Sequence, residues 1–140
     1  MRRPILIGSE IYRHSIYAAK HPLSIPRVST ALDLIRAMGW HDPERYVDGP
    51  VATLEQLSRF HDPAYVRAVQ EAEATRHVSE EVRDCHNIGR NGNPVFAEIF
   101  RRPATACGST LKAVELLIRE PGIVHSPAGR SEEHTSELQS

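Results

Sequence analysis

The residues of this chain that could hold a metal ion or act as nucleophiles include eight histidines and two cysteines. A metal site that can be read from sequence places its ligands in close pairs, such as C-x-x-C or two histidines on one helix face. The histidines are isolated here, and Cys85 and Cys107 form no such pair. Cys85 precedes His86, but no acid or second base is placed to complete a nucleophile pair. We therefore predict no metal ligands and no catalytic residue within residues 1–129.

Two aspartates beside histidines are better explained as structural residues. In His61-Asp62-Pro63, Asp62 is placed as the N-cap of a helix and Pro63 as its first residue. In His41-Asp42-Pro43, the proline indicates a turn.

Composition excludes several classes of protein. The chain has 140 residues, enough for one small domain, and its 17 basic and 18 acidic residues form no block that favours nucleic acid. Two cysteines are too few for a disulfide framework. The apolar run Ile5–Ile7 is far shorter than a signal-peptide core, and no segment approaches the length of a membrane span. These features predict a soluble cytoplasmic protein with reduced thiols.

Apolar patterning predicts the elements of the first half. A buried strand is expected at 5–7, and the following residues 9–27 are expected to be irregular because two prolines hold their end extended. Helical spacing of apolar residues predicts a helix from Val28 to Met38 that ends at Gly39. Thr53 is expected to cap a short helix, and the helix from Pro63 is expected to reach about residue 75.

In the second half, we expect a charged linker at 76–86, a loop at 87–94 and the start of a helix at 95–100. The clearest helix is predicted at 104–120, with one apolar side formed by Leu111, Val114, Leu117 and Ile118. A buried strand at 123–125 follows, and a loop at 126–129 leaves its carboxyl end. This order indicates an α/β fold, in which ligands bind beyond the carboxyl ends of the strands. The loop at 126–129 is therefore a candidate site.

Residues 130–140 differ from the rest of the chain, because Leu138 is their one large apolar side chain. Their sequence, RSEEHTSELQS, resembles the in-frame translation of a widely used DNA-sequencing adapter. The alternatives are a natural tail or an engineered tag. We therefore expect two segments: a native portion at 1–129 that continues in the complete protein, and a non-native tail at 130–140.

Several segments in order resemble the histone deacetylase family, including bacterial deacetylases of the acetoin-utilisation type. They are HPLSIPRV at 21–28, FHDPAYV at 60–66, the loop at 89–96, and the helix and strand that lead to HSPAG at 125–129. In the family, this last strand continues as P-A-G-G-x-H-H. The resemblance implies the N-terminal part of an arginase/deacetylase-like three-layer α/β fold with a mainly parallel sheet, incomplete in this chain.

The resemblance also implies a Zn²⁺-dependent hydrolase that removes acetyl groups from acetyl-lysine or acetylated small amines. In the family, two aspartates and a histidine hold zinc, paired histidines transfer protons, and a tyrosine polarises the carbonyl. All of these would lie beyond Gly129. This chain by itself is therefore expected to be inactive and to bind no zinc, nucleic acid or membrane.

Three positions carry over from the family. Arg27 matches an arginine that lines the channel through which acetate is thought to leave, where a guanidinium attracts a carboxylate. Gly129 matches a glycine whose backbone lines the same channel. At the substrate rim, where many members have an aspartate, this chain has Arg90-Asn91-Gly92-Asn93. Asn91 is an uncharged hydrogen-bond acceptor in place of that aspartate. Small acetylated amines are therefore possible substrates as well as peptides.

Two other interpretations remain at this point: a complete small interaction module that uses the helices at 28–38 and 104–120, and a pseudoenzyme of the same fold. A complete domain needs strands to pair with 123–125, and the patterning predicts only 5–7.

Overall fold

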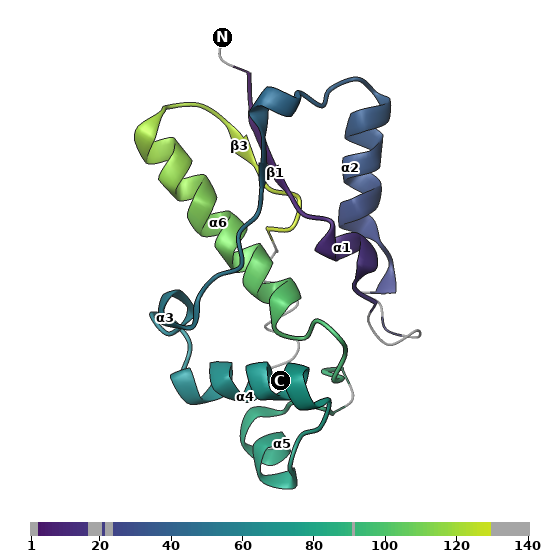
Figure 1. Ribbon diagram of the computed structural model, residues 1–140, viewed down its shortest axis with the longest axis vertical. Coiled ribbons are helices and arrows are strands. Elements are labelled where there is room, and N and C mark those ends of the chain that lie inside the picture. The colour runs from purple at the N-terminus through teal and green to yellow at the C-terminus, as the bar shows by residue number, and fades with distance from the viewer. Residues whose placement is uncertain (1–2, 17–20, 22–23, 91, 130–140) are drawn as a thin grey trace.

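The computed structural model describes residues 3–16, 21, 24–90 and 92–129, and its centre is a small parallel sheet (Figure 1). The strands are β1 (Ile5–Gly8), β2 (Tyr46–Asp48) and β3 (Val124–His125), in the order β2-β1-β3. Leu6 pairs with Tyr46 on one side and with His125 on the other. Both predicted strands are thus present, but β3 is not buried as predicted, since His125 and Ile123 are exposed. Strand β2 was missed because three residues between turns give too short a pattern.

Two long helices connect these strands. Helix α2 (Arg27–Ala37) joins β1 to β2, and α6 (Arg101–Arg119) joins β2 to β3 across β1. Because the two crossovers run in opposite directions along the sheet, the right-handed rule puts the helices on opposite faces. Figure 1 shows α2 and α6 on either side of the strands. The predicted α/β fold with a parallel sheet is confirmed.

Three shorter helices form a second packed region near the N-terminal end of α6. These are α3 (Leu54–Leu57), α4 (Pro63–Thr75) and α5 (Glu80–His86), which lie together in Figure 1. Their core joins α4 to the chain before α6 through Val69, Ala72, Val78, Ile88, Phe96 and Ile99.

Helices α3 and α4 begin at the capping residues that the sequence predicted. Thr53 and Gln56 form a reciprocal capping box at α3, and Asp62 accepts from the Ala64 N–H at 2.7 Å, with Pro63 first in α4. Gly39 follows Met38, the C-cap residue of α2, and has φ +70°, a conformation that glycine adopts without strain.

Three predicted segments were wrong. Residues 9–27 contain the helix α1 (Ile11–His14), and the expected linker at 76–86 contains α5, which the Ser79 side chain caps. Residues 97–100 form turns, so the long helix begins at Arg101. Short helices such as α1 and α5 lack enough turns to show a period, and tertiary packing stabilises them instead.

The buried face of α6 is also different from the predicted one. Its buried residues are the small ones, Ala104, Thr105, Gly108 and Ser109, whereas the predicted apolar side is exposed, with Ile118 at 79%. The segment 49–52 runs so close that the Ala52 N–H donates to the Ala104 carbonyl at 2.9 Å. Because two backbones can approach this closely only where side chains are small, the buried side of α6 consists of small residues. The spacing of large apolar residues therefore predicted the wrong side of the helix.

None of the described helices is both long and apolar enough to cross a bilayer.

Candidate functional site

A cavity of about 200 Å³ lies beyond the carboxyl ends of β1 and β3. It brings together two residues that sequence predicted for one site, Arg27 and Gly129, although they are far apart along the chain. The cavity also contains Tyr12, which follows β1, and Arg102 in the first turn of α6. This is the edge of a parallel sheet at which ligands generally bind.

Arg27 is the first residue of α2, and its position is set by the extended chain before it. Pro26 occupies the N-cap position, and the Arg27 N–H donates to the Ile25 carbonyl at 2.8 Å. Pro26 also accepts hydrogen bonds from the Thr30 and Ser29 hydroxyls, at 2.7 Å and 3.2 Å. These contacts fix the start of the helix and hold Arg27 at the wall of the cavity, where its side chain is exposed.

Gly129 ends the loop that leaves β3. Its N–H donates to the Ser126 carbonyl at 3.0 Å, which closes a tight turn over Pro127 and Ala128. A Cβ at this position would approach the Ser126 oxygen at 3.2 Å, so a side chain would crowd the turn. The turn thus presents backbone to the cavity, and the buried Ala128 is part of the same wall.

Tyr12 and Arg102 were missed by the sequence analysis. Tyr12 is 4% exposed, and burial raises the pKa of its phenol to about 12 despite the opposing charge of Arg102. Within the described part of the chain, the Tyr12 hydroxyl makes no hydrogen bond of ordinary geometry. The nearby Ser109 side chain nevertheless lowers the pKa of Tyr12 and so offsets part of the increase caused by burial. The Arg102 guanidinium carbon lies 5.9 Å from the Tyr12 ring centroid. The position of Tyr12 just after a predicted strand was the available signal.

The predicted rim residue, Asn91, lies outside the described residues. The loop around it is held by the Gly89 N–H, which donates to the Asn93 carbonyl at 2.8 Å, and by an ion pair between Arg90 and Asp84. His21 Nε2 lies 3.2 Å from the Gly92 carbonyl oxygen, so the segment before α2 contacts this loop.

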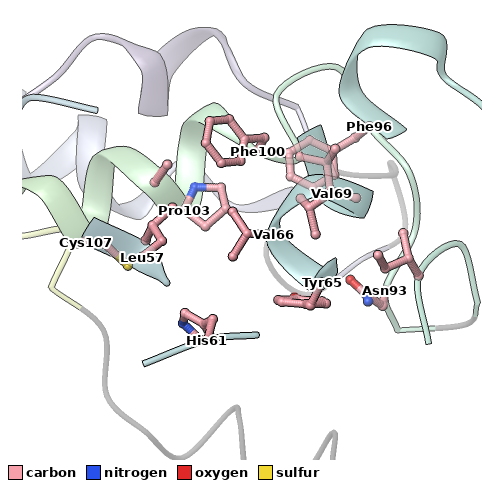
Figure 2. Close-up of a pocket in the computed structure, with 13 residues that line it drawn as sticks. Leu57, His61, Tyr65, Val66, Val69, Asn93, Phe96, Phe100, Pro103 and Cys107 are labelled. Carbon is pink, nitrogen blue, oxygen red and sulfur yellow. The ribbon is translucent and has the colours of Figure 1, made fainter. Parts of the chain in front are cut away.

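A second cavity, of about 240 Å³, lies between α4 and the start of α6. Figure 2 shows His61 and Cys107 toward one end and Asn93 and Phe96 toward the other. Its walls are mainly apolar, and burial raises the pKa of the Cys107 thiol, which opposes formation of a reactive thiolate.

Comparison with known proteins identifies the relatives of this chain. Residues 21–130 match the histone deacetylase domain. This chain belongs to the histone deacetylase family. Among curated proteins, it is 30% identical over 115 residues to the acetoin utilization protein AcuC of Bacillus subtilis (strain 168), which covers 82% of this chain.

Solved structures of histone deacetylase homologues have the same fold as this chain. A homologue from Aquifex aeolicus and a homologue complexed with SAHA each superpose with a TM-score of 0.85, at 35% identity over 91% of this chain. The chain spans about a third of the length of these relatives, 30% of AcuC and 34% of the solved chains.

The family is generally metal-dependent, so we asked whether the described residues fit a zinc ion. Zinc sites need three or four ligands from histidine, cysteine, aspartate or glutamate. Within residues 3–16, 21, 24–90 and 92–129, no three such side chains come together. The described residues therefore offer no complete zinc-ligand set.

Proposed function

We propose that this chain is the N-terminal part of a zinc-dependent deacetylase that hydrolyses acetyl-lysine or acetylated small amines in the cytoplasm. The single observation that carries the proposal is the shared cavity of Arg27 and Gly129 in a chain of this family. The zinc ligands, the proton-transferring histidines and the carbonyl-polarising tyrosine would lie C-terminal to Gly129. Residues 130–140 would then be an adapter-derived tail, and the chain by itself would be inactive.

In this proposal, Arg27 binds the acetate that hydrolysis releases. A guanidinium donates two parallel N–H groups, which match the two oxygens of a carboxylate. An amine product is cationic, so the same group repels it and separates the two products. Gly129 would add backbone to the wall of the cavity without a side chain. Asn91 would contribute an uncharged hydrogen-bond acceptor at the substrate rim.

The experiment is a chimera in which residues 1–129 replace the matching part of Bacillus subtilis AcuC. We expect acetate release from an acetylated amine that chelation abolishes and zinc restores. The variant R27M should lose about tenfold in turnover, because the guanidinium would no longer draw the released acetate away from the amine product. The matched control is R67M, which removes an exposed arginine from α4.

Three results would contradict parts of the proposal. A folded chimera without activity would favour a pseudoenzyme. Turnover by the 140-residue chain alone would show that the catalytic groups are not absent. Stable binding of a protein partner through the exposed side of α6, with no activity in the chimera, would favour the interaction module.

A further inference from the structure

The cavity of about 240 Å³ between α4 and the start of α6 has no role in the proposed function. Among the described residues, it shares only Pro103 with the cavity that contains Arg27. Four of its lining residues also belong to the core of the second packed region: Val69, Ile88, Phe96 and Ile99. Each of these is at most 8% exposed, so the cavity reaches side chains that close packing holds in place.

This cavity opens to solvent at one end, and its walls favour a neutral occupant. His61 and Cys107, which Figure 2 shows toward one end, are exposed residues, although the Cys107 thiol lies deep enough for burial to raise its pKa. The described lining contains no aspartate, glutamate, lysine or arginine. Because a buried charge without a partner is costly, a neutral ligand fits these walls better than an ion does.

The size and the walls of the cavity match one substituted aromatic ring. An engineered apolar cavity of about 150 Å³ in another protein binds benzene, so about 240 Å³ leaves room for a ring with small substituents. Tyr65, Phe96 and Phe100 bring three rings to the lining, and aromatic pairs prefer edge-to-face or offset contacts. Water fills such a space poorly, because a buried water needs two to four polar partners and most of this lining is apolar.

Asn93 supplies one oriented hydrogen-bond acceptor at the end of the cavity away from His61 (Figure 2). Its Nδ2 donates to the Asn87 carbonyl at 2.8 Å, and its own carbonyl accepts from the Gly89 N–H at 2.8 Å. These two contacts hold the loop and orient the amide, so that Oδ1 is the atom of this side chain that accepts from a ligand. A hydroxyl group on the ring would donate to it.

We propose that this cavity binds a small neutral phenol, with its ring between Tyr65, Phe96 and Phe100 and its hydroxyl on Asn93 Oδ1. The inference goes beyond the proposed function and does not depend on it. The cavity is a binding site here, and none of its residues takes part in the deacetylation chemistry.

The test measures binding of two probes, p-cresol and toluene, by the 140-residue chain at pH 7, where a phenol keeps its proton. Amide NMR spectra are recorded during each titration. We expect shifts at Val66, Ile88 and Phe100, which line the cavity. The Kd of p-cresol should be about fivefold lower than that of toluene, because p-cresol makes one further hydrogen bond.

Two tryptophan variants show whether the cavity is the place of binding. C107W fills the mouth of the cavity and should raise the Kd of both probes at least tenfold. C85W places the same side chain on the exposed cysteine of α5, outside the described lining, and should leave both values unchanged. C107S keeps the size of the side chain and should bind both probes as the wild type does.

The variant N93A tests the hydrogen bond separately. It should raise the Kd of p-cresol to that of toluene and leave the Kd of toluene unchanged. If N93A loosens the loop and does not fold, the ratio of the two Kd values in the wild type still tests the same contact. Equal Kd values for the two probes in the wild type, no shifts in the cavity with either probe, or wild-type binding by C107W would each overturn the inference.

Discussion

Glu73 on α4 binds Arg101 and thereby begins the longest helix of the chain. Its Oε2 accepts from the backbone N–H groups of Phe100 and Arg101, each at 2.9 Å, and its Oε1 accepts from Arg101 Nε at 2.7 Å. The N-cap residue Phe100 offers no side-chain cap of its own. A carboxylate from another helix thus satisfies the N–H groups that a helix start leaves unpaired.

We predict that E73Q lowers the free energy of unfolding by about 2 kcal/mol, since a capping group and its charge are both weakened. Urea unfolding followed by circular dichroism measures this. E71Q, on the exposed side of the same helix, is the matched control and should change stability by less than about 0.5 kcal/mol. Equal stability of the two variants would show that the Glu73 cap contributes nothing in solution.

A second prediction concerns the contact between α6 and the segment 49–52. A Cβ on Gly108 would lie 1.9 Å from the Pro50 carbonyl oxygen, so G108A forces the backbones apart. The usual helix gain of about 1 kcal/mol for Gly→Ala is then outweighed. We expect a loss of about 3 kcal/mol or more in urea unfolding. G122A, where the added methyl meets nothing within 4 Å, should be neutral, and a stable G108A would contradict the close approach.

The same contact explains how much of the fold the sequence could predict. Caps at Thr53 and Asp62 and the apolar strands at 5–7 and 123–125 are local signals, and the structure has all of them. The buried side of α6 is a tertiary property. Gly108 is buried because another backbone lies against it, and no periodicity in the helix records that neighbour.

The residues of the candidate site also differ in how far the sequence could predict them. Arg27 and Gly129 could be named because they stand in recognisable segments, and the cavity contains both. Tyr12 had one local signal, its position just after a predicted strand, although α1 is too short to show a pattern. Arg102 had none, because only the packing of α6 brings it to the cavity. Asn91 remains a prediction, because it lies outside the described residues.

The third prediction is a loss of stability in acid that depends on Arg13. Its guanidinium binds Asp33 through Nη1 and Nη2, at 2.8 Å and 2.7 Å, and Glu10 through Nε at 2.7 Å. Hydrogen bonds from Arg13 lower the pKa values of Glu10 and Asp33 below their ordinary 4.5 and 3.8. The unfolded chain therefore binds protons more readily, and the contribution of these pairs is present above about pH 4.5 and lost as pH falls.

Urea midpoints measured from pH 7 to pH 3 should fall less steeply in R13M than in the wild type. Because these side chains are largely exposed, added salt should reduce the difference between the two proteins. R67M, which removes an arginine from the exposed side of α4, should follow the wild-type curve. Parallel curves for R13M and the wild type would show that the cluster does not form in solution.

The fourth prediction concerns the opposite end of the pH scale. Burial raises the pKa of Tyr12 from 10.0 to about 12, so above pH 10 the unfolded chain loses this proton while the folded chain keeps it. Stability should therefore fall as pH rises from 10 to 12, and Y12F should remove part of that fall. Near pH 7, Y12F should be neutral or slightly stabilising, because it removes a buried hydroxyl that lacks an ordinary hydrogen bond.

The measurement combines urea midpoints with an ultraviolet absorbance titration of the four tyrosines. Y12F should lack the phenol that ionises near pH 12, whereas Y65F, which removes a tyrosine at the other cavity, should retain it. If Y12F and the wild type lose stability together above pH 10, Tyr12 is ionised in the folded chain. The phenol would then be open to water, and the cavity that it shares with Arg27 and Arg102 would be wider in solution than its walls indicate.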